Sequence, residues 1–252
     1  MKKMLLKAIL IGAALSAAVQ AQDLAERANR RGLDELDRKD YTAAAKSFER
    51  AIVLKPEYAS ANYNLGTAYF YLGRLDAAAE KLRRAMQIDP LSAASANQLG
   101  VVYLGSGDNL GAVASFKKAI ELKPDHASAH YNLGCAYIRL GKFKPAAESL
   151  ERARVIDPAN AEIRLNLAYA LSREKRLSEA VAEMETAVKL QPGDAELQLF
   201  LGNLFVLKND RSRAIDQYAK LKLVDTDRAR ELYDAVFNGR MITISDKRLA
   251  RR

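Results

Sequence analysis

The sequence contains no tryptophan, one cysteine and two histidines in 252 residues. The single cysteine, Cys135, cannot close an internal disulfide, and so few soft ligands do not provide a structural metal site. His126 and His130 are four residues apart, but the stretch HASAH lacks the glutamate and the third ligand of a metalloprotease site. The sequence therefore predicts no metal and a fold held together by packing alone, with Cys135 as an inert small side chain.

Motifs for catalysis are missing as well. The chain has no glycine-rich phosphate loop, no nucleophile elbow and no pair of carboxylates in a catalytic setting. Glu80, Glu121 and Glu148 stand at places that predict a solvated helix face. We therefore predict no catalytic residue, no cofactor, no small-molecule substrate and no enzyme activity.

Positive charge is concentrated at the two ends of the chain. The formal net charge is +9, of which Lys2, Lys3 and Lys7 contribute +3 and the segment 239–252 contributes +4. The body between them carries about +2, which is close to neutral for a domain of this size, so we do not expect nucleic acid as its partner. We interpret 239–252 as a basic mobile tail. Adding a strand to a partner's sheet and touching an anionic surface are alternatives for this tail.

The first residues, MKKMLLKAILIGAALSAAVQA, combine a basic start, an apolar run from Ala8 to Val19 and small residues at Val19 and Ala21. This pattern predicts a secretory signal peptide over residues 1–21 that is cleaved after Ala21, and hence a periplasmic or secreted protein. The alternative is an uncleaved membrane anchor, although the twelve-residue run is shorter than the roughly 20 residues that a spanning helix needs. Only an uncleaved leader or the basic tail would bring the chain to a membrane.

The remainder is organised around a unit of 34 residues, seen most clearly in residues 59–92, ASANYNLGTAYFYLGRLDAAAEKLRRAMQIDPLS. Its apolar and small residues recur at helical spacing in two groups. This predicts two amphipathic helices joined by a tight turn, with Gly73 as the left-handed residue that ends the first helix. Asp76 is predicted to cap the second helix, and Pro90 to stop it. Because one such pair is too small to be stable alone, it needs neighbouring copies.

Copies of this unit follow in register. The places of Leu65, Gly66, Tyr69, Ala78, Leu82, Ala85 and Pro90 are taken one unit later by Leu99, Gly100, Tyr103, Ala112, Phe116, Ala119 and Pro124, and then by Leu133, Gly134, Tyr137, Ala146, Leu150, Ala153 and Pro158. This set of residues resembles the signature of the tetratricopeptide repeat family. The resemblance implies an all-α, right-handed solenoid of helix-turn-helix hairpins, whose first helices line a concave groove.

We predict a repeat domain over residues 22–238. Its six repeats are placed at 25–58, 59–92, 93–126, 127–160, 161–194 and 195–228, and a closing helix follows at 227–237. The first repeat has a polar first helix, as an end repeat requires, with Arg31 and Glu35 at places that are apolar elsewhere. The last two repeats depart from the pattern, with Lys175 in place of the turn glycine and Thr226 in place of the proline.

The resemblance also suggests where a partner binds. The place before each Leu-Gly pair, or its equivalent, carries a carboxamide in four repeats: Asn64, Gln98, Asn132 and Asn166. A carboxamide both donates and accepts, so this ladder suits a peptide backbone, and the alternative is a row of merely solvated side chains. On the same face we expect residue types that often anchor partners, namely Tyr63, Tyr71, Tyr131, Arg139 and Arg173. Tyr69, Tyr103 and Tyr137 are instead expected in the core.

Chaperone-binding members of the family hold a C-terminal carboxylate with a clamp of lysine and asparagine. This chain lacks that clamp, because Tyr63 and Tyr131 stand before Asn64 and Asn132 and no matching set of lysines is present. We therefore expect a non-catalytic adaptor of the bacterial cell envelope that mediates protein-protein interaction by binding a partner peptide or loop in the groove. The alternative is a structural or assembly factor of a secretion, pilus or polysaccharide-export complex that uses the convex face or the ends.

Overall fold

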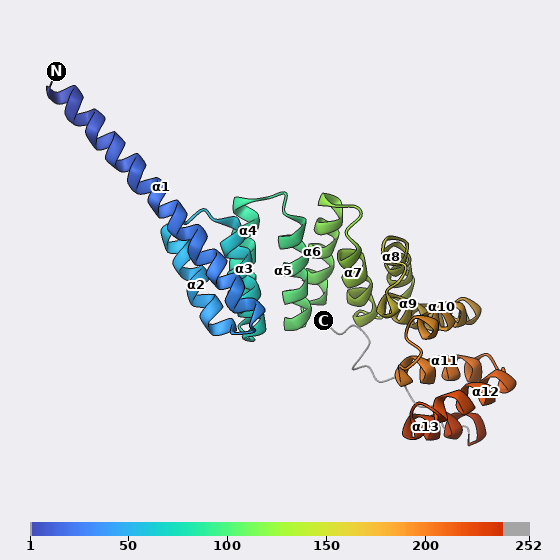
Figure 1. Cartoon of the computed structure of the whole chain (residues 1–252). Helices are drawn as coiled ribbons and strands as arrows, with labels where there is room; N and C mark the ends of the chain where they lie inside the picture. The colour runs from blue at the N-terminus through green and yellow to red at the C-terminus, as the bar shows by residue number, and fades with distance from the viewer. Residues whose placement is uncertain (1, 239–252) are drawn as a thin grey trace. The chain divides into compact units, whose positions relative to one another are not determined.

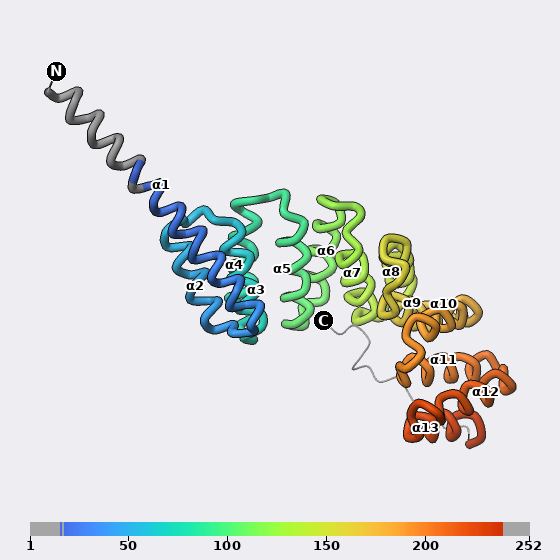
Figure 2. The backbone as a smooth tube through the Cα atoms, in the orientation of Figure 1, coloured from blue at the N-terminus to red at the C-terminus, as the bar shows by residue number. Residues whose placement is uncertain are grey.

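The computed structural model describes the backbone of residues 2–238 and the side chains of Ser16 and residues 18–238. This part of the chain consists of helices joined by short turns, without a strand (Figure 1). The all-α repeat fold predicted from the sequence is therefore confirmed. The chain divides into two compact units between Gly107 and Asp108, and Figure 2 follows the backbone through each. The predicted tail at 239–252 lies outside the described residues.

Unit 1 contains five helices. They are α1 (Lys2–Asp37), α2 (Tyr41–Leu54), α3 (Ala59–Tyr71), α4 (Leu75–Ile88) and α5 (Ala93–Ser106). No proline interrupts residues 2–37, and α1 runs without a break through Ala21, where cleavage of the leader is predicted. A search of the described residues found no helix with the length and apolar character required for a membrane span.

Unit 2 contains the remaining eight helices of the described chain. They are α6 (Asn109–Leu122), α7 (Ala127–Arg139), α8 (Phe143–Ile156), α9 (Ala161–Arg173), α10 (Leu177–Leu190), α11 (Ala195–Leu207), α12 (Arg211–Lys222) and α13 (Thr226–Phe237). Each helix contacts the next one along the chain. The helix α13 includes the segment 227–237 and packs on both α11 and α12, where its Leu232 is fully buried beside Leu199 and Leu221.

The turn inside each repeat passes through one residue with left-handed backbone geometry. This residue is a glycine in three repeats: Gly73 (φ 73°), Gly107 (φ 83°) and Gly141 (φ 69°). In the other three it carries a side chain: Lys39 (φ 61°), Lys175 (φ 61°) and Asn209 (φ 59°). The prediction for Gly73 is therefore confirmed. Because all six places share this geometry, the hairpin imposes it whether or not the residue is one that favours it.

The cap predicted for the second helix was wrong. The helix α4 begins at Leu75, so its N-cap is Arg74, and Asp76 lies inside the first turn. In other repeats the capping aspartate stands two places earlier than the place of Asp76. The carboxylates of Asp40, Asp108 and Asp210 each accept a hydrogen bond from the backbone N–H of the residue three places later. At the other end, α4 stops at Ile88 and does not reach Pro90, which confirms the predicted stop.

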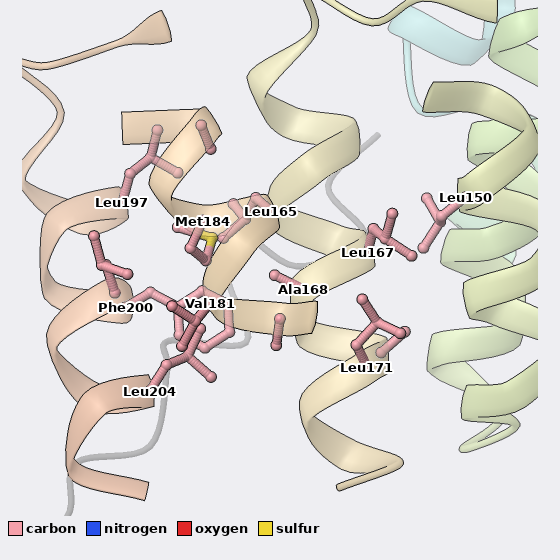
Figure 3. Close-up of a cluster of buried hydrophobic side chains, with 14 of the residues drawn as sticks. Leu150, Leu165, Leu167, Ala168, Leu171, Val181, Met184, Leu197, Phe200 and Leu204 are labelled. Atoms are coloured by element: carbon pink, nitrogen blue, oxygen red, sulfur yellow. The ribbon is translucent and has the colours of Figure 1, made fainter. Parts of the chain in front are cut away.

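Small residues bring the helices of a hairpin close together. A Cβ atom added at Gly66 would lie 2.7 Å from Cγ of Leu82, and one at Gly134 would lie 2.5 Å from Cγ of Leu150. Gly66 and Gly134 are therefore required by the close packing of the second helix of their hairpins. In unit 2 this packing builds a continuous core in which Leu167 and Leu171 of α9 lie toward Leu150, while Met184, Phe200 and Leu204 fill the other side (Figure 3).

Candidate partner-binding face

The predicted carboxamide ladder links first helices of consecutive repeats. In unit 2, Asn166 of α9 is fully buried, and its Nδ2 donates to the hydroxyl of Tyr131 on α7 (3.3 Å) and to the carbonyl of Glu162 (2.9 Å). In unit 1, Nδ2 of Asn64 donates to Oδ1 of Asn29 on α1 (3.0 Å). Each of these links joins residues 35 apart. Asn64 and Asn166 are therefore buried and paired rather than solvated, and Asn166 in this arrangement is closed to a partner.

The other two members of the ladder differ in burial. Asn132 on α7 is 8% exposed, whereas Gln98 on α5 is half-buried. Binding of a peptide backbone by this ladder stays a prediction.

In unit 1, the predicted tyrosines have different surroundings. Tyr63 is half-buried against the core, and burial is the main reason why the pKa of its hydroxyl is raised. Tyr71 is 55% exposed and stacks on Tyr41, with the ring centroids 4.6 Å apart and the planes 13° from parallel. Of the three tyrosines expected in the core, Tyr69 is buried, while Tyr103 and Tyr137 are half-buried and pack against core clusters.

In unit 2, the helices α7 and α9 contact each other and carry the remaining predicted residues. We call their shared surface the α7–α9 face, and it consists of Tyr131, Cys135 and Arg139 on α7 and of Leu165, Tyr169 and Arg173 on α9. Within each helix these residues are spaced four apart, so they lie along one side of it. The tyrosines are half-buried, the arginines are exposed, and Cys135 and Leu165 are buried beneath them. The face therefore presents two tyrosines and two arginines above an apolar base.

Arg173 is held against two aromatic rings. Its guanidinium carbon lies 4.3 Å from the ring centroid of Phe143 and 5.8 Å from that of Tyr169, and its Nη1 donates to the Tyr169 hydroxyl at 3.0 Å. The two rings meet edge to face, 6.1 Å apart. Cation–π attraction and this hydrogen bond fix a long side chain that would otherwise sample many rotamers.

Sequence reasoning missed Phe143, Tyr169 and Tyr41. Arg173 lies 30 residues after Phe143, and Tyr71 lies 30 residues after Tyr41, so both stacks join the end of a first helix to the start of the preceding second helix. A search for aromatic or arginine residues at this offset would have found both stacks.

The two histidines that had hinted at a metal occupy structural positions. Nε2 of His130 lies 2.9 Å from the carbonyl of Pro124, and His126 is the N-cap residue of α7. Among the described side chains, no group of three or more metal-binding residues gathers. Burial raises the pKa of the Cys135 thiol to about 12, so its nucleophilic thiolate form is scarce near neutral pH.

Comparisons with known proteins agree with this architecture. A tetratricopeptide repeat model matches residues 29–93, 131–195 and 165–226, and a TPR repeat model matches residues 105–141. No curated protein sequence matches the chain significantly.

Several solved structures share the fold. The structure of PilF from Pseudomonas aeruginosa is 20% identical, has a TM-score of 0.73, and aligns over 86% of this chain and 99% of its own. YrrB, described as a TPR protein with an unusual peptide-binding site, is 23% identical with a TM-score of 0.67, over 75% of this chain and 99% of its own. MamA from Desulfovibrio magneticus RS-1 is 24% identical with a TM-score of 0.63, over 67% of this chain and 96% of its own.

Together, the repeated hairpins, the close-packed glycines and the family models that match more than half of the sequence establish that the chain belongs to the tetratricopeptide repeat family.

Proposed function

We propose that this protein is a non-catalytic adaptor of the bacterial cell envelope, which binds a peptide or loop of a partner protein on the α7–α9 face. Tetratricopeptide repeat proteins generally mediate protein-protein interactions, and they are typically scaffolds without enzymatic activity. One of the solved structures with this fold is described as having a peptide-binding site.

The observation that carries the proposal is the makeup of the α7–α9 face. Tyrosine and arginine are the residues that most often dominate binding energy at protein interfaces, because they combine apolar area with directed hydrogen bonding. Arg173 is already held in place by Phe143 and Tyr169, so less side-chain entropy is lost when a partner binds it.

The envelope part of the proposal rests on the leader sequence. Its basic start, apolar run and small residues at Val19 and Ala21 favour export and cleavage after Ala21. Intact-mass measurement of the protein recovered from an expressing bacterium tests this part. A mature protein that begins at Gln22 and fractionates with the periplasm is expected, and retention of Met1 in the cytoplasmic fraction would contradict it.

Affinity capture from an envelope extract tests the binding face. The bait is the full chain with a C-terminal tag, compared with an Arg139→Ala, Arg173→Ala double variant. The matched control is Lys117→Ala with Arg152→Ala, which also removes two exposed cations from unit 2. We expect the first variant to lose the partner and the control to keep it, while circular dichroism shows equal helicity for all three proteins.

The control pair also tests a second surface. Lys117 and Arg152 line an open cleft of about 380 Å³ between α6, α7 and α8, whose apolar lining includes Ile120 and Leu133. Leu133 is two residues beyond Tyr131 on α7, a rotation of about 200°, so this cleft and the α7–α9 face use opposite sides of that helix. Loss of the partner only in the control variant would favour the alternative function as an assembly factor that uses its outer surface.

A further inference from the structure

We infer that Arg173 binds a carboxylate of the partner, so that the segment recognised on the α7–α9 face is an acidic peptide. This inference rests on the proposed function and specifies the chemistry of its partner. It concerns a single arginine at the end of α9, together with the aromatic rings of Phe143 and Tyr169 that position it.

The open edge of the guanidinium is the first observation. Nη1 of Arg173 is used by the Tyr169 hydroxyl, whereas among residues 18–238 no acceptor takes the hydrogens of Nε and Nη2 and no carboxylate forms an ion pair with this arginine. The Nε and Nη2 atoms form the side of the guanidinium that fits both oxygens of a carboxylate. Arg173 therefore presents a preformed two-pronged donor.

A neighbouring arginine shows what this edge binds. Nε of Arg176 donates to Oε1 of Glu179 at 2.8 Å, and Nη2 donates to Oε2 at 2.7 Å. Arg213 stacks on Phe205 at 4.6 Å and pairs with Asp210 through its Nε, which lies 2.6 Å from Oδ2. Arg213 thus combines an aromatic stack with a carboxylate. Arg173 has the stack, but no carboxylate of residues 18–238 binds its Nε and Nη2 edge.

The charge around Arg173 is the second observation. Lys142 and Lys144 flank Phe143 in the sequence, Lys175 follows Arg173 by two residues, and all three are exposed. The single acidic residue among these neighbours is Glu174. The exposed residues next to the stack in the sequence therefore carry a net positive charge, which favours an acidic segment over an apolar or basic one.

A peptide fits these observations better than an anionic lipid surface does. A charged surface is attracted by flexible lysines alone and gains little from a fixed guanidinium plane, whereas a carboxylate beside an apolar residue can use both the open edge and the exposed side of the rings. The partner segment is therefore expected to place an acidic side chain beside an apolar one.

Fluorescence anisotropy with short labelled peptides tests the inference on the full mature protein. Two peptides share one alanine, serine and leucine frame and carry either glutamate or glutamine at alternate positions, with an amidated C-terminus so that only side chains supply carboxylates. We expect the glutamate peptide to bind at least roughly tenfold more tightly, as a charge-assisted two-pronged contact implies. Arg173→Lys keeps the charge but loses the fork and the stack, and it is expected to remove most of this preference. Arg152→Lys is the matched control and is expected to leave the preference unchanged.

Equal binding of the two peptides, an unchanged preference in Arg173→Lys, or no detectable binding of the glutamate peptide would overturn the inference. Vesicles of phosphatidylcholine with phosphatidylglycerol form a parallel arm, and binding to these vesicles that depends on Arg173, without preference for the glutamate peptide, would overturn it in favour of a lipid. Capture of a protein partner that depends on Arg139 and Arg173, combined with equal binding of the two peptides, would leave the proposed function standing and reject only the acidic ligand. A clear preference for the glutamate peptide in a protein that captures no partner would support the acidic ligand and count against the proposed function.

Discussion

At the scale of single residues, Glu183 connects three consecutive helices of unit 2. Its Oε2 lies 2.6 Å from Nη1 of Arg164 on α9, and its Oε1 lies 3.5 Å from Nε of Arg154 on α8. The side chains of Arg164 and Glu183 are only 11% and 17% exposed, so these charges have little access to water. Removing the carboxylate therefore leaves two guanidinium groups without their countercharge.

We predict that Glu183→Gln lowers the free energy of unfolding by about 2 kcal/mol. This loss is smaller than the loss expected when a fully buried ion pair is broken, because water still reaches the edge of this cluster. Urea denaturation followed by circular dichroism measures the change. The control is Glu179→Gln, which breaks the exposed pair with Arg176 and should have little effect. A Glu183 variant as stable as this control would show that the cluster contributes nothing measurable.

Cys135 makes the stability of the protein change with pH in the alkaline range. Burial raises its pKa to about 12 from an ordinary value of 9.0. Between these values the unfolded chain releases the thiol proton while the folded chain keeps it, so the free energy of unfolding falls as pH rises, by up to about 1.4 kcal/mol per pH unit. Below the ordinary pKa both states hold the proton, and the thiol adds no pH dependence.

The corresponding measurement is the stability of the wild type and of Cys135→Ala in urea at a series of pH values. The difference between the two proteins should be constant near neutral pH, and the wild type should lose more stability than the variant as pH rises above about 9. Tyrosines and lysines titrate in both proteins and cancel in the difference. Parallel curves over the whole alkaline range would contradict the buried thiol.

At the scale of an element, the turn between the two helices of a repeat is strained where it lacks glycine. Lys175 has a φ of 61° at the place where Gly141 has 69°, and the left-handed region costs a side-chain-bearing residue about 1–2 kcal/mol. We predict that Lys175→Gly raises the free energy of unfolding by roughly 1 kcal/mol, after allowance for the greater freedom of glycine in the unfolded chain. The reverse change, Gly141→Lys, should destabilise by a similar amount, and thermal unfolding of both variants checks the pair. A stabilising Gly141→Lys would refute the argument.

The elements also show which features a sequence can predict. The turn at Gly73 and the stop before Pro90 were predicted because each follows from the backbone chemistry of one residue. The capping residue was misplaced because the helix begins at Leu75, one residue before Asp76, so the carboxylate falls inside the first turn. Such an offset of one or two residues is set by the turn geometry, which the repeat pattern locates only approximately.

The candidate site was predicted less fully than the hairpins. Arg139 and Arg173 are exposed, and their part in binding a partner stays a prediction. The stack of Arg173 on Phe143 was not predicted, because it joins two repeats and depends on how consecutive hairpins pack. The burial of Asn166 has the same origin, because its partner Tyr131 belongs to the preceding repeat. The repeat pattern gives the place of each residue within its own hairpin, whereas these contacts depend on the side chains of two hairpins at once.

At the scale of the whole molecule, the boundary between the two compact units falls inside the predicted third repeat, 93–126. Within unit 1, α5 contacts α3 and α4, and within unit 2, α6 contacts α7. Unit 2 therefore contains its own large core together with the cluster of Leu199, Leu221, Ala229 and Leu232 that α13 completes. Since repeat proteins are stabilised by contacts between neighbours, the helices that belong to each unit are defined by this packing.

We predict that the fragment 108–252 folds by itself, with a helical circular dichroism spectrum and a cooperative unfolding transition in urea. The comparison is a fragment cut at the repeat boundary, 127–252, which lacks α6. Without α6, the apolar surface that Leu133 and its neighbours present toward Ile120 becomes more exposed. The shorter fragment should therefore be less stable by about 2 kcal/mol or more, the scale of burying one or two large apolar side chains. Equal stability of the two fragments would show that α6 does not belong to the cooperative unit, and a longer fragment that stays unfolded would show that unit 2 requires the first half of the chain.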